Sequence, residues 1–324
     1  KAMAELSEAE AAVYDRQLRV WGIEVQKRLN AAKILIAGYT GLAVEVAKNI
    51  VLAGVGSLSL MDSTLCASAD PDNFLVPHDA KHQASVAEVS AAALQEMNPL
   101  VKVSVQAGSA DVKDLSFVAS YQASKSASAV VLLVDQSLER QQAWDQACTA
   151  HGAAFYSAAS QGTCTYFFAN LHNHTFTPLE KAGADLADTD VSKPQELQFP
   201  SLESALKTDW SRLHPRRSHK LICLLAACAH FEQKHNRPAQ SEDLSEIKQI
   251  IQKHITQAKL AKLNVPDDLI EEFLCDEHLP AVNAICGGVL ANEMLKAVSH
   301  KGEPVNNFFF FGLSDGAGVV QRVG

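Results

Sequence analysis

A short glycine-containing segment is the clearest candidate for chemistry in this sequence. Residues 38–41 (Gly-Tyr-Thr-Gly) lie between an apolar run and a stretch with helical periodicity. A glycine-rich turn between a strand and a helix is where dinucleotide-binding folds hold phosphates, because backbone amides and the helix dipole both favour an anion there. Asp62 follows 24 residues after Gly38, where an acid that binds a ribose is expected. Together these residues point to nucleotide chemistry.

The same segment departs from the G-x-G-x-x-G pattern at two positions. Counted from Gly38, Thr40 replaces the second glycine and Ala43 the third. Alanine is tolerated at the third position, but the second glycine lets the backbone approach the phosphates, and a β-branched side chain obstructs that approach. The segment alone leaves two interpretations open, a working site with unusual residues or a retained fold whose site has decayed. Thr40 favours decay.

Other reactive side chains give weaker signals. The odd number of cysteines, several in apolar runs such as LICLLAACA around Cys223, favours a reducing compartment, and the absence of a C-x-x-C pair argues against a zinc site. His172 and His174 have no carboxylate or cysteine neighbours, so we expect exposed strand-end residues and no metal. Asp135 follows an apolar strand, where this fold can place a functional acid. We favour a structural role for Asp135, as the cap of a helix over residues 137–150. The seven cysteines are Cys66, Cys148, Cys164, Cys223, Cys228, Cys275 and Cys286.

The elements around these residues predict an α/β fold. A capping box at Ser7 predicts a helix from Glu8 to Val20 that stops near Gly22. Apolar runs predict strands at 33–37, 57–61, 101–105, 129–134, 153–156, 163–170 and 308–311. Helical periodicity appears at 42–53, 86–97, 138–150, 202–274 and 280–298, and residues 172–200 resemble a loop.

This alternation predicts a Rossmann-like, doubly wound sheet with a helical insertion. We divide the chain into residues 1–172, the first part of an α/β domain with a degenerate nucleotide site; 173–277, a loop and helical insertion; and 278–324, the rest of the α/β domain. Residues 308–311, four phenylalanines, are expected to form a strand buried on both faces.

Composition narrows the classes of partner. The chain has 324 residues, 47% of them apolar, and a formal net charge of −9. No dense cluster of lysine and arginine stands out, which argues against nucleic acid or an anionic membrane as the main partner. The sequence contains no run of 18 apolar residues, so it predicts no transmembrane helix.

Three stretches resemble the activating enzymes of ubiquitin-like proteins: YDRQLRVWG at 14–22, LAVEVAKNIVLAGVGSLSLMD at 42–62 and PVNNFFFFG at 304–312. Within that family the NNFFFF stretch and the short length resemble the non-cysteine subunits of the SUMO branch. The resemblance implies a heterodimer with a large subunit that carries the catalytic cysteine. It also implies SUMO as the protein that is adenylated and then transferred to that cysteine, and nuclear, with some cytoplasmic, location.

Three elements of an active adenylating half are altered here. The family's G-x-G-G-x-G is read as Gly38, Thr40, Gly41 and Ala43, the N-x-x-R-Q-F motif lacks its arginine at 70–75, and residues 79–82 do not supply the glycine and lysine of the next motif. The resemblance therefore implies that this chain binds no cofactor or metal itself and is inactive alone, while ATP and Mg²⁺ bind to the partner. Cys164-Thr165 superficially matches the family's thioester site, but its β-rich surroundings argue against a catalytic role.

One residue is expected to serve the partner. The resemblance implies that Arg16 of the YDRQ helix crosses to the partner's ATP, where a guanidinium can neutralise phosphate charge with two parallel hydrogen bonds. Arg19 faces a similar direction, and a surface ion pair is the simpler explanation for it. Alternatives are the corresponding subunit for another ubiquitin-like protein, a stand-alone NAD-dependent oxidoreductase, and a scaffold that does not assist chemistry. The oxidoreductase is disfavoured because no convincing His/Tyr/Lys set is present.

Overall fold

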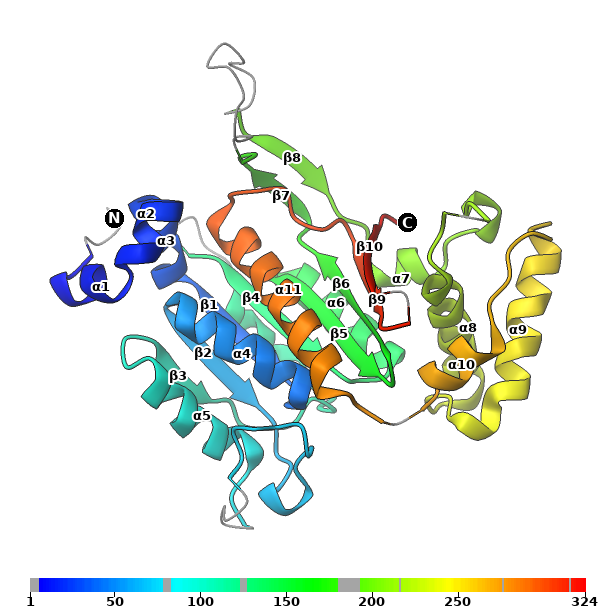
Figure 1. The fold of residues 1–324 in the computed structure, drawn as a ribbon, viewed down its shortest axis with the longest axis horizontal. Helices are drawn as coiled ribbons and strands as arrows, with labels where there is room; N and C mark the ends of the chain where they lie inside the picture. Colours follow the sequence, from blue (N-terminus) through cyan, green and yellow to red (C-terminus); the bar gives the residue numbers. More distant parts are fainter. Residues whose placement is uncertain are drawn as a thin grey trace.

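The computed structural model describes residues 6–77, 83–122, 127–179, 193–215, 217–275, 277–314 and 316–324. Their central feature is an eight-stranded sheet in the order β10-β9-β6-β5-β4-β1-β2-β3 (Figure 1). The strands are β1 (Lys33–Ala37), β2 (Ser57–Met61), β3 (Lys102–Val105), β4 (Ala129–Val134), β5 (Ala154–Gln161), β6 (Cys164–Asn170), β9 (Phe308–Gly312) and β10 (Ala317–Gln321).

The helices alternate with these strands along the chain. They are α1 (Glu8–Val13), α2 (Asp15–Trp21), α3 (Ile23–Ala31), α4 (Gly41–Ala53), α5 (Val86–Met97), α6 (Leu138–His151), α7 (Leu202–Leu206), α8 (Lys220–His235), α9 (Leu244–Gln257), α10 (Asp267–Phe273) and α11 (Pro280–Ser299). Short 3-10 turns lie at Cys66–Ser68, Ser116–Tyr121, Trp210–Arg212 and Ser241–Asp243.

The sheet confirms the predicted Rossmann-like class. Strands β3, β2, β1, β4 and β5 are parallel, in the order of a dinucleotide-binding half, and the strand order reverses between β1 and β4. β6, β9 and β10 then extend the sheet in antiparallel pairs. In a fold of this type ligands bind beyond the carboxyl ends of the parallel strands, at the point of reversal.

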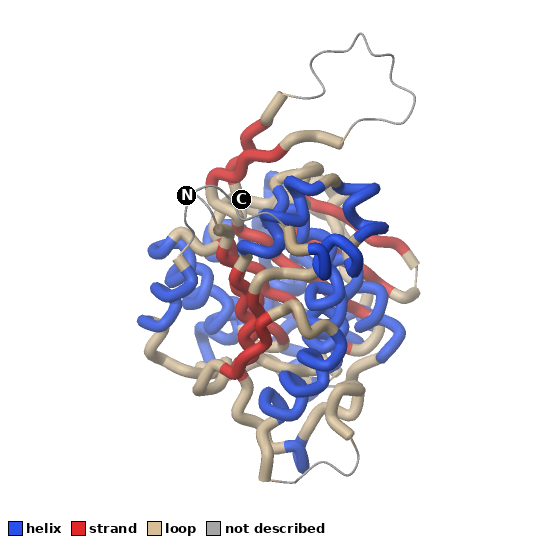
Figure 2. The backbone as a smooth tube through the Cα atoms, turned by 90° about the vertical axis from the view of Figure 1, so that its left-hand side faces the viewer, coloured by secondary structure: helices blue, strands red, loops and turns tan. Residues whose placement is uncertain are grey.

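Helices cover both faces of the sheet, as the turned view shows (Figure 2). Successive strand residues therefore point into two different cores: Ile34 packs with α4, α5 and α11, whereas Leu35 packs with α6 and α8. The phenylalanines alternate in the same way, with Phe308 in one core and Phe309 in the other. The prediction of a strand buried on both faces is confirmed.

The helical segment after residue 200 packs onto the sheet instead of forming an isolated unit. Leu202 of α7 and Leu224 of α8 are buried in the same cluster as Leu133 of β4. The predicted loop at 172–200 was wrong in part, because β7 (Asn173–Phe176) and β8 (Gln195–Gln198) pair in an antiparallel hairpin that projects from the body (Figure 2). The divisions at 172 and 277 remain a prediction.

The N-terminal helix also differs from the prediction. The helix is interrupted at Tyr14, which separates α1 from α2. A third helix, α3, precedes the first strand. The Tyr14 ring is buried against Gly54, where an added Cβ would lie 2.3 Å from the ring. Its hydroxyl also accepts a hydrogen bond from Asn98 Nδ2 at 2.9 Å. Burying this ring turns the chain at a point where sequence periodicity alone predicts a continuous helix.

Candidate functional site

The glycine-containing turn lies at the carboxyl end of β1, as the sequence predicts. Gly38 has a φ of +79°, and an added Cβ would lie 2.3 Å from the carbonyl oxygen of Val134, so the turn requires glycine there. Thr40 occupies the N-cap position of α4 but does not cap it. Its hydroxyl instead donates a hydrogen bond to Asp135 Oδ2. The threonine therefore ties the turn to the neighbouring strand β4.

The N-terminus of α4 is occupied by a carboxylate of the chain itself. Asp70 Oδ2 accepts a hydrogen bond from the Gly41 amide at 2.8 Å and lies 3.3 Å from His278 Nδ1, while Oδ1 accepts from the Asp72 amide at 2.9 Å. Partial burial of Asp70 would raise its pKa, but the hydrogen bonds from His278, Gly41 and Asp72 outweigh it and hold the pKa at about 2. Asp70 is thus an anion placed where a nucleotide phosphate would bind.

Other acidic residues around the turn add to the negative charge of Asp70. Asp62 accepts hydrogen bonds from the Tyr39 amide at 2.7 Å and the Thr64 amide at 2.8 Å, so the expected ribose-binding acid stabilises the turn. A cleft of about 600 Å³ beside α4 is lined by Asp62, Asp70, Asp72 and Glu277, and its described lining residues include no lysine or arginine. Such a lining repels a triphosphate. Residues 79–82, where a phosphate-binding lysine was sought, lie outside the described part of the chain.

Asp135 does not cap α6, and that prediction was wrong. Ser137 is the N-cap, and its hydroxyl accepts from the Arg140 amide. Glu232 of α8 accepts from the Leu138 and Glu139 amides at 3.3 and 3.0 Å. Asp135 instead accepts from Thr40 Oγ1 and, at 2.9 Å, from the Ser160 amide. Its burial raises its pKa, although His278 and these hydrogen bonds oppose the rise.

The sequence analysis did not predict the roles of Asp70 and Glu232. The sequence holds a local signal for Asp70 but none for Glu232. Asp70 follows β2 by nine residues, so an Asp–Pro before α5 could have been examined as a partner of the turn. Glu232 lies 94 residues beyond Leu138 along the chain and belongs to a helix of unremarkable periodicity. No local pattern connects it to α6.

The candidate trans-acting arginine lies on the surface of α2. Arg16 is exposed, and within the described residues no hydrogen bond or ion pair involves its guanidinium. Arg19, by contrast, pairs with Asp15 at 3.0 Å across one helical turn. The two arginines therefore differ: Arg19 has a partner within its own helix, and Arg16 can contact another molecule.

Two apolar side chains of the N-terminal helices do not hold α2 in place. Val13 and Val20 are 63% and 73% exposed, so they do not pack it against the body. Tyr14 is held by burial of its ring and by Asn98, and Gln17 Nε2 donates to the carbonyl oxygen of Leu52 at 3.4 Å. Trp21 of α2 also packs against the core that contains α4. Arg16 therefore lies on a helix that is fixed to the body by Tyr14, Gln17 and Trp21, while Val20 of the same helix stays exposed.

Five of the seven cysteines are buried, as expected, whereas Cys66 and Cys275 are partly exposed, and neither His172 nor His174 is exposed as predicted. Cys164 is buried in β6, and burial raises the pKa of Cys223 and of Cys286 to about 12, which disfavours the reactive thiolate. His172 is half-buried with Nε2 2.8 Å from a carbonyl oxygen. His174, expected to be exposed, is buried against the His300 ring, and burial lowers its pKa to about 4. The described residues contain no cluster of three metal-binding side chains.

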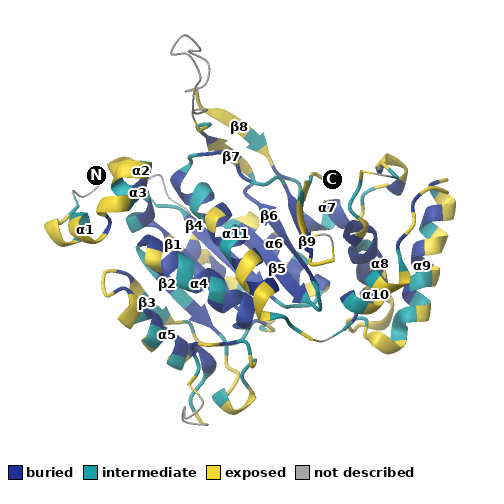
Figure 3. Ribbon diagram, viewed as in Figure 1, coloured by how far each residue is buried: buried dark blue, intermediate teal, exposed yellow. Residues whose placement is uncertain are grey.

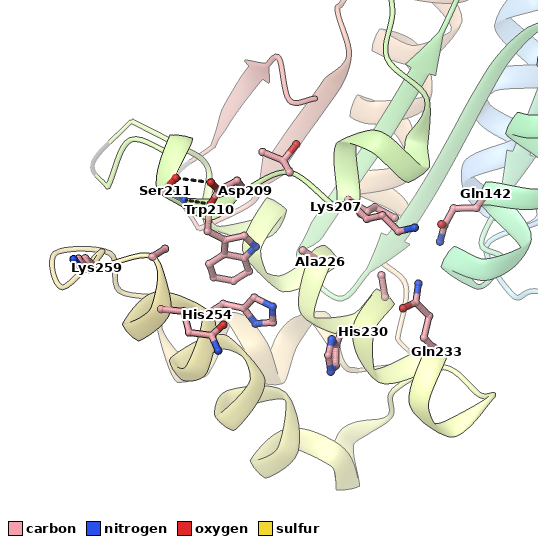
Figure 4. Close-up of a pocket in the computed structure, with 15 residues that line it drawn as sticks. Gln142, Lys207, Asp209, Trp210, Ser211, Ala226, His230, Gln233, His254 and Lys259 are labelled. Atoms are coloured by element: carbon pink, nitrogen blue, oxygen red, sulfur yellow. Dashed lines mark hydrogen bonds between the residues drawn. The ribbon is translucent and has the colours of Figure 1, made fainter.

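A second cleft, of about 630 Å³, lies in the helical segment between α8, α9 and the turn at residues 206–211 (Figure 4). Trp210 stacks on His254 with ring centroids 4.9 Å apart, and the edge of the His230 ring faces His254 at 5.8 Å. No residue of the glycine-containing turn lines this cleft. It is therefore separate from the sheet edge where nucleotide chemistry would occur.

Comparisons with known proteins show the family of the chain. The chain matches the ThiF family over residues 14–321. It is 33% identical to SUMO-activating enzyme subunit 1B-1 of Arabidopsis thaliana over 326 residues, which cover 98% of this chain and 97% of the relative. It is 34% identical to subunit 1A of the same plant, with 98% and 97% covered, and 32% identical to human SUMO-activating enzyme subunit 1, with 98% and 96% covered. The similarity thus extends over nearly the full length of each relative.

Proposed function

The chain belongs to the ThiF family, and from that premise we propose that it acts as the small, non-cysteine subunit of a SUMO-activating enzyme. The observation that carries the proposal is the near-full-length similarity to subunits 1 of plants and animals. A second observation agrees with it: the anion-binding end of α4 holds Asp70, so the fold is retained while its nucleotide position is filled from within.

The proposed reaction takes place on the partner, the large subunit with the catalytic cysteine. There the C-terminal carboxylate of SUMO attacks the α-phosphate of ATP, forming an acyl adenylate and releasing pyrophosphate. The partner's cysteine thiolate then attacks the acyl carbon, forming a thioester and releasing AMP. Neither step needs a nucleophile from this chain, in agreement with the burial of five of its seven thiols.

This chain contributes Arg16 to the first step. Within the described residues, no ion pair or hydrogen bond of the Arg16 guanidinium has to be broken before it contacts the other subunit. It places positive charge beside the nucleotide's phosphates, where negative charge concentrates as the carboxylate attacks. The contacts of Tyr14 and Gln17 hold α2 against the body, and so support a defined direction of approach for Arg16.

We further propose that the chain binds no ATP or Mg²⁺ itself, and that both belong to the partner. The acidic cleft beside α4 supports this, because Asp70 already accepts the hydrogen bond from the Gly41 amide that a phosphate would need. The NAD-dependent alternative meets the same obstacle. The second candidate function is that of the corresponding subunit in the activating enzyme of another ubiquitin-like protein. None of the described helices has the length and hydropathy to cross a membrane. We expect neither nucleic acid nor lipid as a partner, and a mainly nuclear location.

The test is reconstitution with the large SUMO-activating subunit of the same organism. We expect the two chains to co-elute in a 1:1 complex that exchanges pyrophosphate into ATP in the presence of SUMO, and this chain alone to show no exchange. SUMO and its sister modifiers are compared as substrates in parallel. A complex that exchanges pyrophosphate only with another modifier would reassign the chain to that pathway.

A further inference from the structure

We propose that the cleft between α8 and α9 binds an acidic peptide segment of another protein. This cleft, named here the helical cleft, has a volume of about 630 Å³, and none of its described lining residues belongs to the glycine-containing turn. The inference therefore does not depend on the proposed function. The side chains that can meet a ligand in the helical cleft are Lys207, Trp210, His230, Gln233, His254, Gln257 and Lys259.

The first observation is that one wall of the helical cleft is held firmly by the fold. The Trp210 ring is 7% exposed and stacks on the His254 ring with centroids 4.9 Å apart (Figure 4). His254 Nδ1 lies 2.8 Å from the carbonyl oxygen of Ile250, and because that oxygen only accepts, Nδ1 carries the proton and Nε2 is left for a ligand. Figure 3 shows that α8 is mostly buried, whereas α9 carries exposed residues. Side chains that are already held in place lower the entropic cost of binding.

The second observation is the charge of the helical cleft. Lys207 and Lys259 line it, and Asp209 is the sole acidic residue among its described lining residues. The Asp209 carboxylate already accepts hydrogen bonds from the Ser211 amide at 2.9 Å and the Ser211 hydroxyl at 2.7 Å. The whole chain, by contrast, has a formal net charge of −9. The helical cleft is thus a positive region on an acidic protein, and a positive region attracts an acidic partner.

Lys259 is the cation with the clearest role toward a ligand. Lys207 pairs with Glu203 at 2.6 Å, whereas Lys259 forms no ion pair or side-chain hydrogen bond within the described residues. Lys259 also has a φ of +56°, in the left-handed region where a helix end usually has glycine. A lysine at this position strains the backbone, and such strain is retained mainly where the side chain has a function.

The uncharged side chains favour a peptide over a small anion. Gln233 and Gln257 line the helical cleft, and their side-chain amides form no hydrogen bond within the described part of the chain. Each amide offers a donor and an acceptor, as a peptide group does, whereas a phosphate offers mainly acceptors. Small-molecule pockets are also lined mainly by apolar and aromatic side chains, and this lining is mainly polar. An extended acidic peptide can meet the lysines with its carboxylates and the glutamines with its backbone.

The position of the helical cleft leaves the other end of the protein free. Helices α9 and α2 lie at opposite ends of the molecule (Figure 1). A peptide in the cleft therefore leaves Arg16 of α2 accessible. An acidic protein can bind to this chain while Arg16 contacts a different molecule.

The test uses the full chain and a fluorescein-labelled peptide of alternating glutamate and serine. Fluorescence anisotropy at about 50 mM salt, where surface charges are weakly screened, should give a Kd on the order of 10–100 µM. Lys259→Glu should weaken binding about 10-fold. Lys259→Gly, which removes the side chain and suits the left-handed backbone, should weaken it about 3-fold. Lys262→Glu is the matched control, because this exposed lysine does not line the cleft, and it should change the Kd by less than about 2-fold.

Each outcome decides for or against the acidic peptide. All three variants change an exposed residue, so their thermal unfolding should match that of the unmodified chain, and Lys259→Gly decides if the glutamate variant unfolds more easily. A peptide that binds the unmodified chain and both Lys259 variants equally well would place its site elsewhere and overturn the inference. Equal binding of a lysine–serine peptide, or no binding of the acidic one, would overturn it too. Displacement of the peptide by an equal concentration of inorganic phosphate would show that a small anion is the occupant.

Discussion

Replacing Arg16 with alanine should slow the reaction of the heterodimer without disturbing this subunit. Arg16 is exposed and has no hydrogen bond or ion pair within the described chain, so the free energy of unfolding should change by no more than about 0.5 kcal/mol. The anchors of its helix, Tyr14 and Gln17, remain in place. Any loss of activity therefore reports the guanidinium itself.

The expected loss follows from the charge that is removed. A guanidinium about 4 Å from a phosphate oxygen contributes about 4 kcal/mol at the effective dielectric constant of ~20 that suits groups near a protein surface. Only the part of this energy that grows between bound substrate and transition state accelerates the reaction. Because the partner retains its own phosphate-binding groups, we expect 1.4–2.7 kcal/mol, or a roughly 10- to 100-fold slower rate.

The assay is ATP–pyrophosphate exchange by the purified heterodimer at saturating ATP and SUMO. Arg16→Lys should restore only part of the rate, because a point charge cannot form two parallel hydrogen bonds. Arg19→Ala is the matched control from the same helix. It breaks the exposed pair with Asp15, worth roughly 0.3–0.5 kcal/mol of stability, and should leave exchange within about 3-fold of the unmodified enzyme. An unchanged rate for Arg16→Ala in a complex that assembles normally would refute the trans role.

Three further predictions concern this chain's own site and thiols. Calorimetry of the isolated chain should detect no Mg-ATP binding at micromolar concentration, because Asp70 fills the end of α4; tight magnesium-dependent binding would contradict this. Cys164→Ser should leave the heterodimer able to form the SUMO thioester on the partner, seen on a non-reducing gel, since the thiol is buried in β6. The pKa of Asp70 is lowered to about 2 from 3.8, so its stabilisation is complete above pH 3.8 and is lost as pH falls through 2. In urea unfolding, Asp70→Asn should therefore cost on the order of 1–2 kcal/mol at pH 6 and progressively less below pH 4, whereas a pH-independent difference would show that the charge is unimportant.

Much of the scaffold follows from local patterns. The strands at 33–37 and 57–61 and the helix between them are indicated by apolar periodicity, and Gly38 and Gly54 mark the turns. The loss of the second glycine at Thr40 likewise indicates a degenerate site. Such features depend on neighbouring residues, so they can be inferred without knowing how the chain folds back on itself.

The details of the site depend on contacts between distant segments. Asp70 meets Gly41 across 29 residues and His278 across 208. The break of the first helix at Tyr14 depends on Asn98, 84 residues away, because the buried ring and its hydroxyl need that partner. The helical pattern alone therefore predicts a helix that continues through Tyr14.

The sequence by itself indicated the fold class and the family, and it pointed to Arg16 as the residue that we propose serves another subunit. Only the tertiary structure decided what became of the old nucleotide position, because a carboxylate can fill it only when the segment after β2 folds over α4. It also showed that Val20 and Ile285 remain exposed. Periodicity marks both as apolar, but whether an apolar side chain faces the chain's own core or another molecule depends on which surfaces the fold has already covered.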